Sequence, residues 1–258
     1  MPYTKITSDR DQPDLDQNAT IWRYMDMPKL ASMLATRSVF FTQLPHLGDP
    51  FEGTLIKAVK DGVAEMQPII AEKHPHLLRT QEEHKNNIMA SRSYAYASCW
   101  HRNEYESAAM WFQYAKDGFG VAVKSSLGRL VDSFRAVEED VWIGQINYHD
   151  YNTAQPPQNS LWTPMFQKRK SFEHEREVRA VVMDWDRMAE LRGSWKFEKN
   201  PVHGRPVAAD LNALIEKIYL APQAPKWFAD VIRTIVQSLG YAGVEIVQSD
   251  MTDGPTYF

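Results

Sequence analysis

The stretch Lys168–Val182, KRKSFEHEREVRAVV, limits the possible folds more than any other part of the chain. Nine of its first twelve residues can carry charge, and it then ends in an apolar run. Successive side chains of a β-strand point to opposite faces, so a strand here places Glu175, Glu177 and Arg179 on one face. A buried carboxylate is costly unless a cation or a hydrogen-bond donor accompanies it.

Two interpretations of this stretch stay open on the residues alone. The structural one is a ladder of salt bridges at a sheet edge, formed with Arg179, Lys170 and Arg176. The functional one is an acidic cleft whose carboxylates are held by these cations, because clefts are where ionisable groups gather for chemistry. The apolar end of the stretch would anchor such a site in the core.

Composition favours a globular protein and argues against several functions. The chain has 258 residues, 43% of them hydrophobic, and a formal net charge of -4, which is unlike a nucleic-acid coat. Cys99 is the only cysteine, so neither an intramolecular disulfide nor a cysteine-based zinc site is expected. No apolar run approaches the roughly 20 residues of a membrane span, and the N-terminus lacks a signal pattern. We expect a cytoplasmic protein without membrane contact.

Strand-like and helix-like segments mix without a strict βαβ period, which favours an α+β fold. We expect a loose tail over residues 1–19 and one α+β domain over 20–258, with a helical insertion at about 54–92. Its central β-sheet is mixed, open to being split, and flanked by helices. The central strands are expected near Ile21–Tyr24, Tyr94–Ser98 and Val178–Met183.

Motifs of the commonest nucleotide-binding and hydrolytic folds are missing. The chain contains no GxGxxG after a strand, no GxxxxGK[ST] and no GxSxG. HEREV begins like the zinc-binding helix of a metalloprotease but lacks the second histidine. No metal-ligating residues are therefore assigned.

The loop LGDPFEG carries the other charged motif. Asp49, Pro50 and Gly53 are typical of a turn, in which Asp49 can serve as the cap. Alternatively, Asp49 and Glu52 lie at the rim of the same cleft as Glu177. Both interpretations stay open.

Several motifs, in order along the chain, resemble a widespread bacterial family of domains of unknown function. They are IWRYMDMPKLASML, GDPFEG, SCWHRNEYESAAMWFQYA, GVAVK and KRKSFEHEREVR. The resemblance runs from about Ile21 to Ser249. It implies positions of interest, and no reaction.

A more distant similarity, to ADP-ribosyltransferases of the arginine–serine–glutamate type, does imply chemistry. Those enzymes carry an arginine on an early strand, a serine on a middle strand and Glu-x-Glu on a later one. The matching residues here are Arg23, Ser98, Glu175 and Glu177. The resemblance implies that the arginine and serine hold NAD, that Glu177 assists cleavage at the ribose and that Glu175 orients the acceptor. The serine stretch departs from the family's Ser-Thr-Ser, since it reads ASCW.

The site expected on this basis has three parts. Its catalytic residues are Glu177 and Glu175. Its NAD-binding residues are Arg23, Tyr24, Ser98, Trp111 and Tyr114. Further charged residues of the site are Asp49, Glu52, Lys170 and Arg179. For the aromatic members, core packing is the alternative to stacking on a base.

Three functions follow as hypotheses. The first is an ADP-ribosyltransferase-like enzyme that uses NAD, such as a bacterial toxin or defence effector, with a protein or nucleic-acid acceptor left open. The second is a Mg²⁺-dependent nuclease or phosphodiesterase that uses the carboxylate cluster. The third is a non-catalytic sensor or partner-binding module. The oligomeric state is not predicted.

Overall fold

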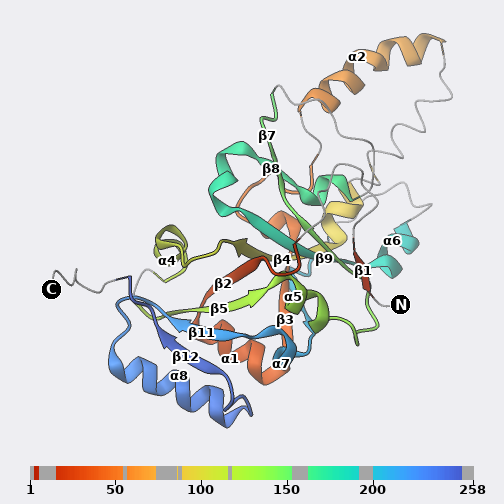
Figure 1. Ribbon diagram of the computed structural model, residues 1–258. Coiled ribbons are helices and arrows are strands. Elements are labelled where there is room, and N and C mark those ends of the chain that lie inside the picture. The colour runs from red at the N-terminus through yellow and green to blue at the C-terminus, as the bar shows by residue number, and fades with distance from the viewer. Residues whose placement is uncertain are drawn as a thin grey trace.

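The computed structural model describes residues 3–5, 16–54, 57–73, 86, 89–115, 118–152, 162–191 and 200–251. Its α+β fold is built on a mixed sheet that contains ten strands in the described part of the chain (Figure 1). These strands are β1 (Tyr3–Lys5), β2 (Thr20–Asp26), β3 (Ser38–Gln43), β4 (Ala95–Arg102), β5 (Gly120–Ser126), β6 (Val141–Gln145), β9 (Glu177–Met183), β10 (Gly204–Ala208), β11 (Lys217–Leu220) and β12 (Glu245–Gln248).

The strand order is β1-β6-β9-β4-β2-β5-β11-β12, and β3 joins this path by pairing with β4 and with β10. The pairs β1–β6 and β11–β12 are parallel, and the other pairs of this sheet are antiparallel. A separate small sheet pairs β7 (Asn147–His149) with β8 (Gln167–Arg169). The three expected central strands correspond to β2, β4 and β9. β4 starts one residue later than expected and extends to Arg102.

Helices cover one face of the sheet, as Figure 1 shows for α1, α7 and α8. The α-helices are α1 (Met27–Thr36), α2 (Lys57–Lys73), α4 (Ala108–Tyr114), α5 (Leu127–Ser133), α6 (Trp185–Leu191), α7 (Leu211–Leu214) and α8 (Lys226–Ser238). Short 3₁₀ segments are η1 (Leu44–His46), η2 (Thr163–Phe166) and η3 (Lys170–Glu175). Within the described ranges, no helix combines the length and apolarity needed to cross a membrane.

Local sequence explains why these helices begin where they do. The Asp26 side chain accepts a hydrogen bond from the backbone N–H of Lys29 and caps α1, and Pro28 lies in the first turn, where its missing N–H costs nothing. Ser126 caps α5 and Asp210 caps α7 in the same way. Each capped helix then turns its apolar side toward the sheet.

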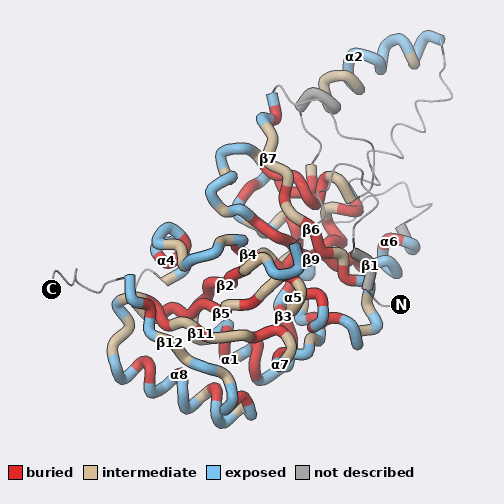
Figure 2. The backbone as a smooth tube through the Cα atoms, in the orientation of Figure 1, coloured by how far each residue is buried: buried red, intermediate tan, exposed pale blue. Residues whose placement is uncertain are grey.

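The main core lies between this helical layer and the sheet. Strand β9 is buried along its whole length, and the centre of the sheet is the most buried part of the tube in Figure 2. Trp100, Val178 and Ala180 belong to this core, and they face α1 and α5 together with Ile21. A second apolar cluster lies on the opposite face, around Ala97, Met165 and Val181.

One sequence expectation needs correction at the level of the fold, and another is partly described. Residues 3–5 of the expected loose tail form β1, which pairs with β6 because an edge strand offers unpaired backbone groups. Residues 6–15 lie outside the described residues. In the expected insertion, α2 is helical and stands apart from the sheet in Figure 1, and residues 89–94 are helical too. The rest of that insertion is only partly described.

Candidate active-site cleft

The central sheet opens between β2 and β4, and a cleft of about 760 Å³ lies at the opening. The two strands pair only at Ile21↔Arg102 and Trp22↔His101. Beyond this point β4 pairs with β3 instead, through Thr42↔Ala97. Side chains of β2, β3, β4, α1, α4 and the start of β9 line the cleft. The described sheet is continuous and therefore not split, and the opening is a local divergence of two neighbouring strands.

One wall of the cleft, here called the arginine wall, is formed by Arg23 and Phe40, with Ser98 bound to Arg23. The Arg23 guanidinium donates from Nη1 to Ser98 Oγ over 2.8 Å and from Nη2 to the Phe40 carbonyl oxygen over 2.8 Å. It also lies 5.7 Å from the centroid of the Trp100 ring. Arg23 thus connects β2 to β3 and β4 across the opening. Both partners are neutral, so the cationic charge of Arg23 is not cancelled.

Burial lowers the pKa of Arg23 to about 10, which leaves the guanidinium protonated at neutral pH. A guanidinium has five donor hydrogens, and the two bonds above use two of them. Ser98 is buried and does not line the cleft, whereas Arg23 is half-buried and does. The role of Ser98 in this geometry is to orient the arginine.

The opposite side, here called the carboxylate wall, is formed by Glu175 and Glu177 with the cations that hold them. Glu177 is the first residue of β9, and its Oε1 accepts from Arg179 Nε over 2.7 Å. Its Oε2 lies 3.3 Å from Lys168 Nζ. Burial alone would raise the pKa of the Glu177 carboxyl, but Arg179 and Lys168 outweigh burial and lower it to about 2. Glu177 is therefore ionised across the physiological range.

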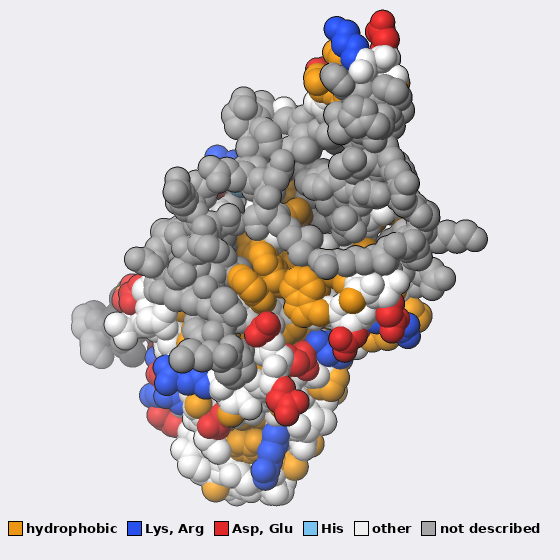
Figure 3. All heavy atoms as spheres, turned by 90° about the vertical axis from the view of Figure 1, so that its right-hand side faces the viewer, with side chains coloured by type: hydrophobic (Ala, Val, Ile, Leu, Met, Phe, Trp, Pro, Cys, Tyr) orange, Lys and Arg blue, Asp and Glu red, His pale blue; other side chains and the backbone are white. Residues whose placement is uncertain are grey.

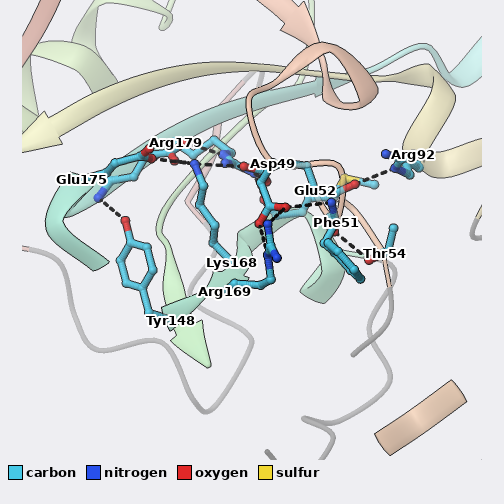
Figure 4. Close-up of polar contacts among 12 residues, drawn as sticks. Asp49, Phe51, Glu52, Thr54, Arg92, Tyr148, Lys168, Arg169, Glu175 and Arg179 are labelled. Atoms are coloured by element: carbon cyan, nitrogen blue, oxygen red, sulfur yellow. Dashed lines mark hydrogen bonds and ion pairs between the residues drawn. The ribbon is translucent and has the colours of Figure 1, made fainter. Parts of the chain in front are cut away.

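Lys168 and Arg179 bridge three carboxylates in this wall (Figure 4). Lys168 Nζ lies 2.6 Å from Glu175 Oε2 and 3.0 Å from Glu52 Oε1. Arg179 Nη1 lies 3.0 Å from Glu52 Oε2, and both side chains are fully buried. The group has three carboxylates and two cations, so it keeps one net negative charge beside the cleft.

The GDPFEG loop contributes Glu52 to this network. Asp49 accepts from the backbone N–H of Phe51 over 3.0 Å, and Gly53 takes a left-handed φ of 66°, so the turn interpretation is confirmed. Arg169 binds both Asp49 oxygens, at 2.7 and 2.9 Å. Neither Asp49 nor Glu52 lines the cleft. The rim interpretation, which the sequence left open beside the turn, therefore does not hold: Arg169 binds Asp49, and Lys168 and Arg179 bind Glu52.

The alternation argument holds for Glu177 and Arg179 but not for Glu175. Glu175 ends η3, and Arg176 has a left-handed φ of 41°, which interrupts the strand before it begins at Glu177. Glu175 still reaches the cleft, from a 3₁₀ turn. The salt-bridge interpretation was right to pair Glu177 with Arg179, but its sheet-edge location is wrong, because β9 lies between β4 and β6.

The cation that holds both glutamates is Lys168, not Lys170, which is exposed. Sequence reasoning missed Lys168, although it begins the charged stretch. No local sequence pattern identifies it, because its position depends on the pairing of β8 with β7. His101 was missed as well, and its position beside Glu177 follows from the pairing of β4 with β9.

The three expected aromatic residues have different environments. Tyr24 lines the cleft but is mostly buried, and its hydroxyl accepts from the backbone N–H of Ser107. Trp111 packs edge-on against Tyr24 at 4.9 Å between centroids and is not a lining residue. Tyr114 lines the cleft and is 44% exposed, so it is the expected aromatic with a ring open to a planar ligand.

The two walls come from opposite faces of the sheet. Directly paired residues share a face, so Trp22, His101 and Glu177 lie on one face. Arg23 follows Trp22 in β2 and therefore points to the other face, which it shares with Ser98 and Trp100. A fixed cation and a fixed carboxylate therefore reach one cleft only because β2 and β4 diverge.

Among the residues that the structure describes, no three His, Cys, Asp or Glu side chains are grouped as a metal site. In the described part of the face seen in Figure 3, acidic and basic side chains are mixed below a hydrophobic patch, and they form no continuous basic surface of the kind that nucleic-acid backbones bind.

No family model matches the chain, and a search of curated proteins finds no match either.

Proposed function

We propose that the protein is an ADP-ribosyltransferase-like enzyme that cleaves NAD at the nicotinamide–ribose bond. The observation that carries the proposal is the convergence of Arg23, oriented by Ser98, and of Glu177 on one cleft. These residues are 75 or more positions apart, and the arginine–serine–glutamate resemblance names all three. The cleft volume of about 760 Å³ lies within the range of ligand pockets.

The chemistry of the two walls suits the two ends of this substrate. A pyrophosphate needs a fixed cation with planar donors, which Arg23 provides. When the glycosidic bond breaks, nicotinamide leaves with the bonding electron pair and the ribose C1′ becomes positively charged, as in glycoside cleavage. The ionised Glu177 and the net negative carboxylate wall would stabilise that charge. A nucleophile then bonds to C1′ and loses its proton to solvent.

The Mg²⁺-dependent nuclease is less well supported by the same geometry. Glu52, Glu175 and Glu177 are bound to Lys168 and Arg179, and a metal would have to displace these cations. Under the non-catalytic hypothesis, the cleft would bind a nucleotide without cleaving it.

The test is NAD binding by calorimetry together with NAD hydrolysis, in which water is the acceptor. Glu177→Gln keeps the side-chain shape but removes the charge. We expect NAD affinity to stay within about threefold and hydrolysis to fall on the order of 10²-fold or more, as for loss of one aligned electrostatic group. Arg23→Ala should instead weaken NAD binding, because the pyrophosphate loses its cation.

The matched control is Arg187→Ala, which removes an exposed arginine of α6 bound to Glu190 and should change neither quantity. The proposal fails if the wild type neither binds nor hydrolyses NAD. Cleavage of nucleic acid on addition of Mg²⁺ would then select the nuclease. Tight NAD binding without turnover by any protein or water acceptor would select the non-catalytic module.

A further inference from the structure

His101 lies on β4 in the wall of the cleft and is 5% exposed. Its Nδ1 is 2.6 Å from the backbone carbonyl oxygen of Glu175. A carbonyl oxygen only accepts hydrogen bonds, so Nδ1 carries the hydrogen. In the neutral ring, Nε2 is then an acceptor, and it has no hydrogen-bond partner among the described residues. A buried acceptor without a partner is costly, unless a ligand donor meets it.

The environment of His101 favours the neutral ring. Burial lowers its pKa, the Glu175 carbonyl opposes this, and the nearby cations Arg176 and His174 lower it further. Tyr24 packs edge-on against the ring, at 6.3 Å between centroids. At neutral pH the imidazole therefore carries a lone pair instead of a hydrogen on its buried Nε2, in a residue that lines the cleft.

A second acceptor lies beside this lone pair. His101 and Glu177 are direct partners in the β4–β9 register and share a face. The Cβ atoms of such a pair are about 4.5–5.5 Å apart. A carboxylate has about four acceptor sites, so Glu177 can accept from a ligand while it is bound to Arg179 and Lys168. Two neighbouring acceptors match a ligand with two donors on adjacent atoms, as in a vicinal diol. A carboxamide offers both of its hydrogens from one nitrogen.

We propose that Nε2 of His101 accepts a hydrogen bond from a ribose hydroxyl, and that His101 and Glu177 together recognise the vicinal diol of the ligand. The proposal rests on the proposed function for the identity of the ligand as NAD. It assigns His101 as a specificity-determining residue that touches the sugar next to the bond that breaks.

A matched pair of substitutions separates binding from structure. In His101→Asn the amide reaches the position of Nδ1, so it keeps the bond to Glu175 and loses the acceptor. In His101→Gln the amide oxygen reaches the position of Nε2, so it keeps an acceptor and loses the bond to Glu175. We expect about three- to tenfold weaker NAD binding for Asn and less than about twofold for Gln, the scale of one neutral hydrogen bond. If the Gln variant instead loses more NAD affinity than the Asn variant, the proposal is overturned. The bond from Nδ1 to Glu175 would then be the contact that matters for binding.

Ligand analogues identify the donor. For NAD lacking a 2′- or 3′-hydroxyl on the nicotinamide ribose, the Asn variant should bind as well as the wild type. A second analogue carries an acetyl group in place of the carboxamide. If the His101→Asn variant binds this analogue as well as the wild type does, the donor is the amide, and the diol proposal is wrong. Thermal unfolding of both variants shows whether they are folded. The ¹⁵N resonance of wild-type Nε2 should move on binding without any substitution, and an unmoved resonance overturns the proposal.

Two outcomes separate this inference from the proposed function. If NAD does not bind but ADP-ribose does, with the same order of the variants, the diol site stands and the NAD reaction fails. If NAD is bound and hydrolysed equally by wild type and Asn variant, the reaction stands and the diol site fails. If neither ligand binds, both are wrong.

Discussion

The two walls of the cleft hold their charges by different means. On the carboxylate wall, Glu177 is fixed by two buried cations, which also bind Glu52 and Glu175. On the arginine wall, Arg23 is fixed by a serine hydroxyl and a backbone carbonyl, both neutral. The first arrangement ties the site to folding, because buried ion pairs are costly to break. The second leaves the charge free for a ligand.

This difference predicts which substitutions change both stability and ligand binding, and which change mainly ligand binding. A substitution in the carboxylate wall should change the folded state and the site together. A substitution in the arginine wall should change mainly the ligand affinity. Three measurements, from the largest expected effect to the smallest, test the comparison.

Arg179→Met should cause the largest loss of stability. Among the residues that the structure describes, it leaves Glu52 and Glu177 with Lys168 as their remaining ion-pair partner, and breaking a buried pair costs about 3–5 kcal/mol. The free energy of unfolding from urea titration measures this. The control, Arg187→Met at an exposed pair, should leave the midpoint unchanged. A loss below about 1 kcal/mol for Arg179→Met would show that the wall does not couple the site to folding.

Glu177→Gln should reduce the loss in free energy of unfolding that occurs as the pH falls. The pKa of Glu177 is lowered from 4.5 to about 2 in the folded protein, so its stabilisation is present above about pH 4.5 and is lost as the pH falls toward 2. Linkage gives about 3 kcal/mol over that window. The pKa of Glu175 is raised, mainly by burial, and this acts in the opposite sense.

The difference between wild type and Glu177→Gln therefore isolates Glu177 in urea titrations at several pH values. If the free energy of unfolding falls equally with pH in the two proteins, Arg179 and Lys168 do not hold Glu177 ionised. The carboxylate wall would then lack the fixed charge on which the comparison depends.

Arg23→Ala should have the smallest effect on stability, about 1 kcal/mol, because it removes hydrogen bonds to neutral partners, and Ser98 Oγ still accepts from Trp100 Nε1. Arg23→Lys keeps the charge but not the planar fork that reaches both Ser98 and Phe40. Urea midpoints of both variants, compared with wild type, check this. If Arg23→Ala destabilises the protein as much as Arg179→Met does, the arginine wall is a structural cross-strand tie and the comparison breaks.

Much of the fold follows from local patterns. The apolar face at Leu30, Met33 and Leu34 and the capping side chain of Asp26 indicate α1, and both features are present. The run after Glu177 indicates a buried strand, and β9 is buried throughout. Such elements are predictable because period and capping are properties of neighbouring residues.

The candidate site is less predictable because it depends on the registers of distant strands. A one-residue shift between β4 and β9 would move His101 and Glu177 apart and turn one of them to the other face. The left-handed Arg176 was equally hidden, since a non-glycine residue with positive φ leaves little trace in sequence. The position of Lys168 depends on the small β7–β8 sheet, which packs on that face only in the folded chain.

By itself, the sequence determined that many charges enter the start of a core strand, and that these charges need partners. It also favoured a turn at Asp49, as one of two interpretations, and its apolar period and the capping residue Asp26 indicated α1. Only the tertiary structure decided which cations are the partners, that Glu175 and Glu177 both reach the cleft, and that Arg23 reaches the same cleft from the opposite face. The reason is physical: burial costs are set by residue type, whereas pairing is set by which strands lie side by side and where they separate.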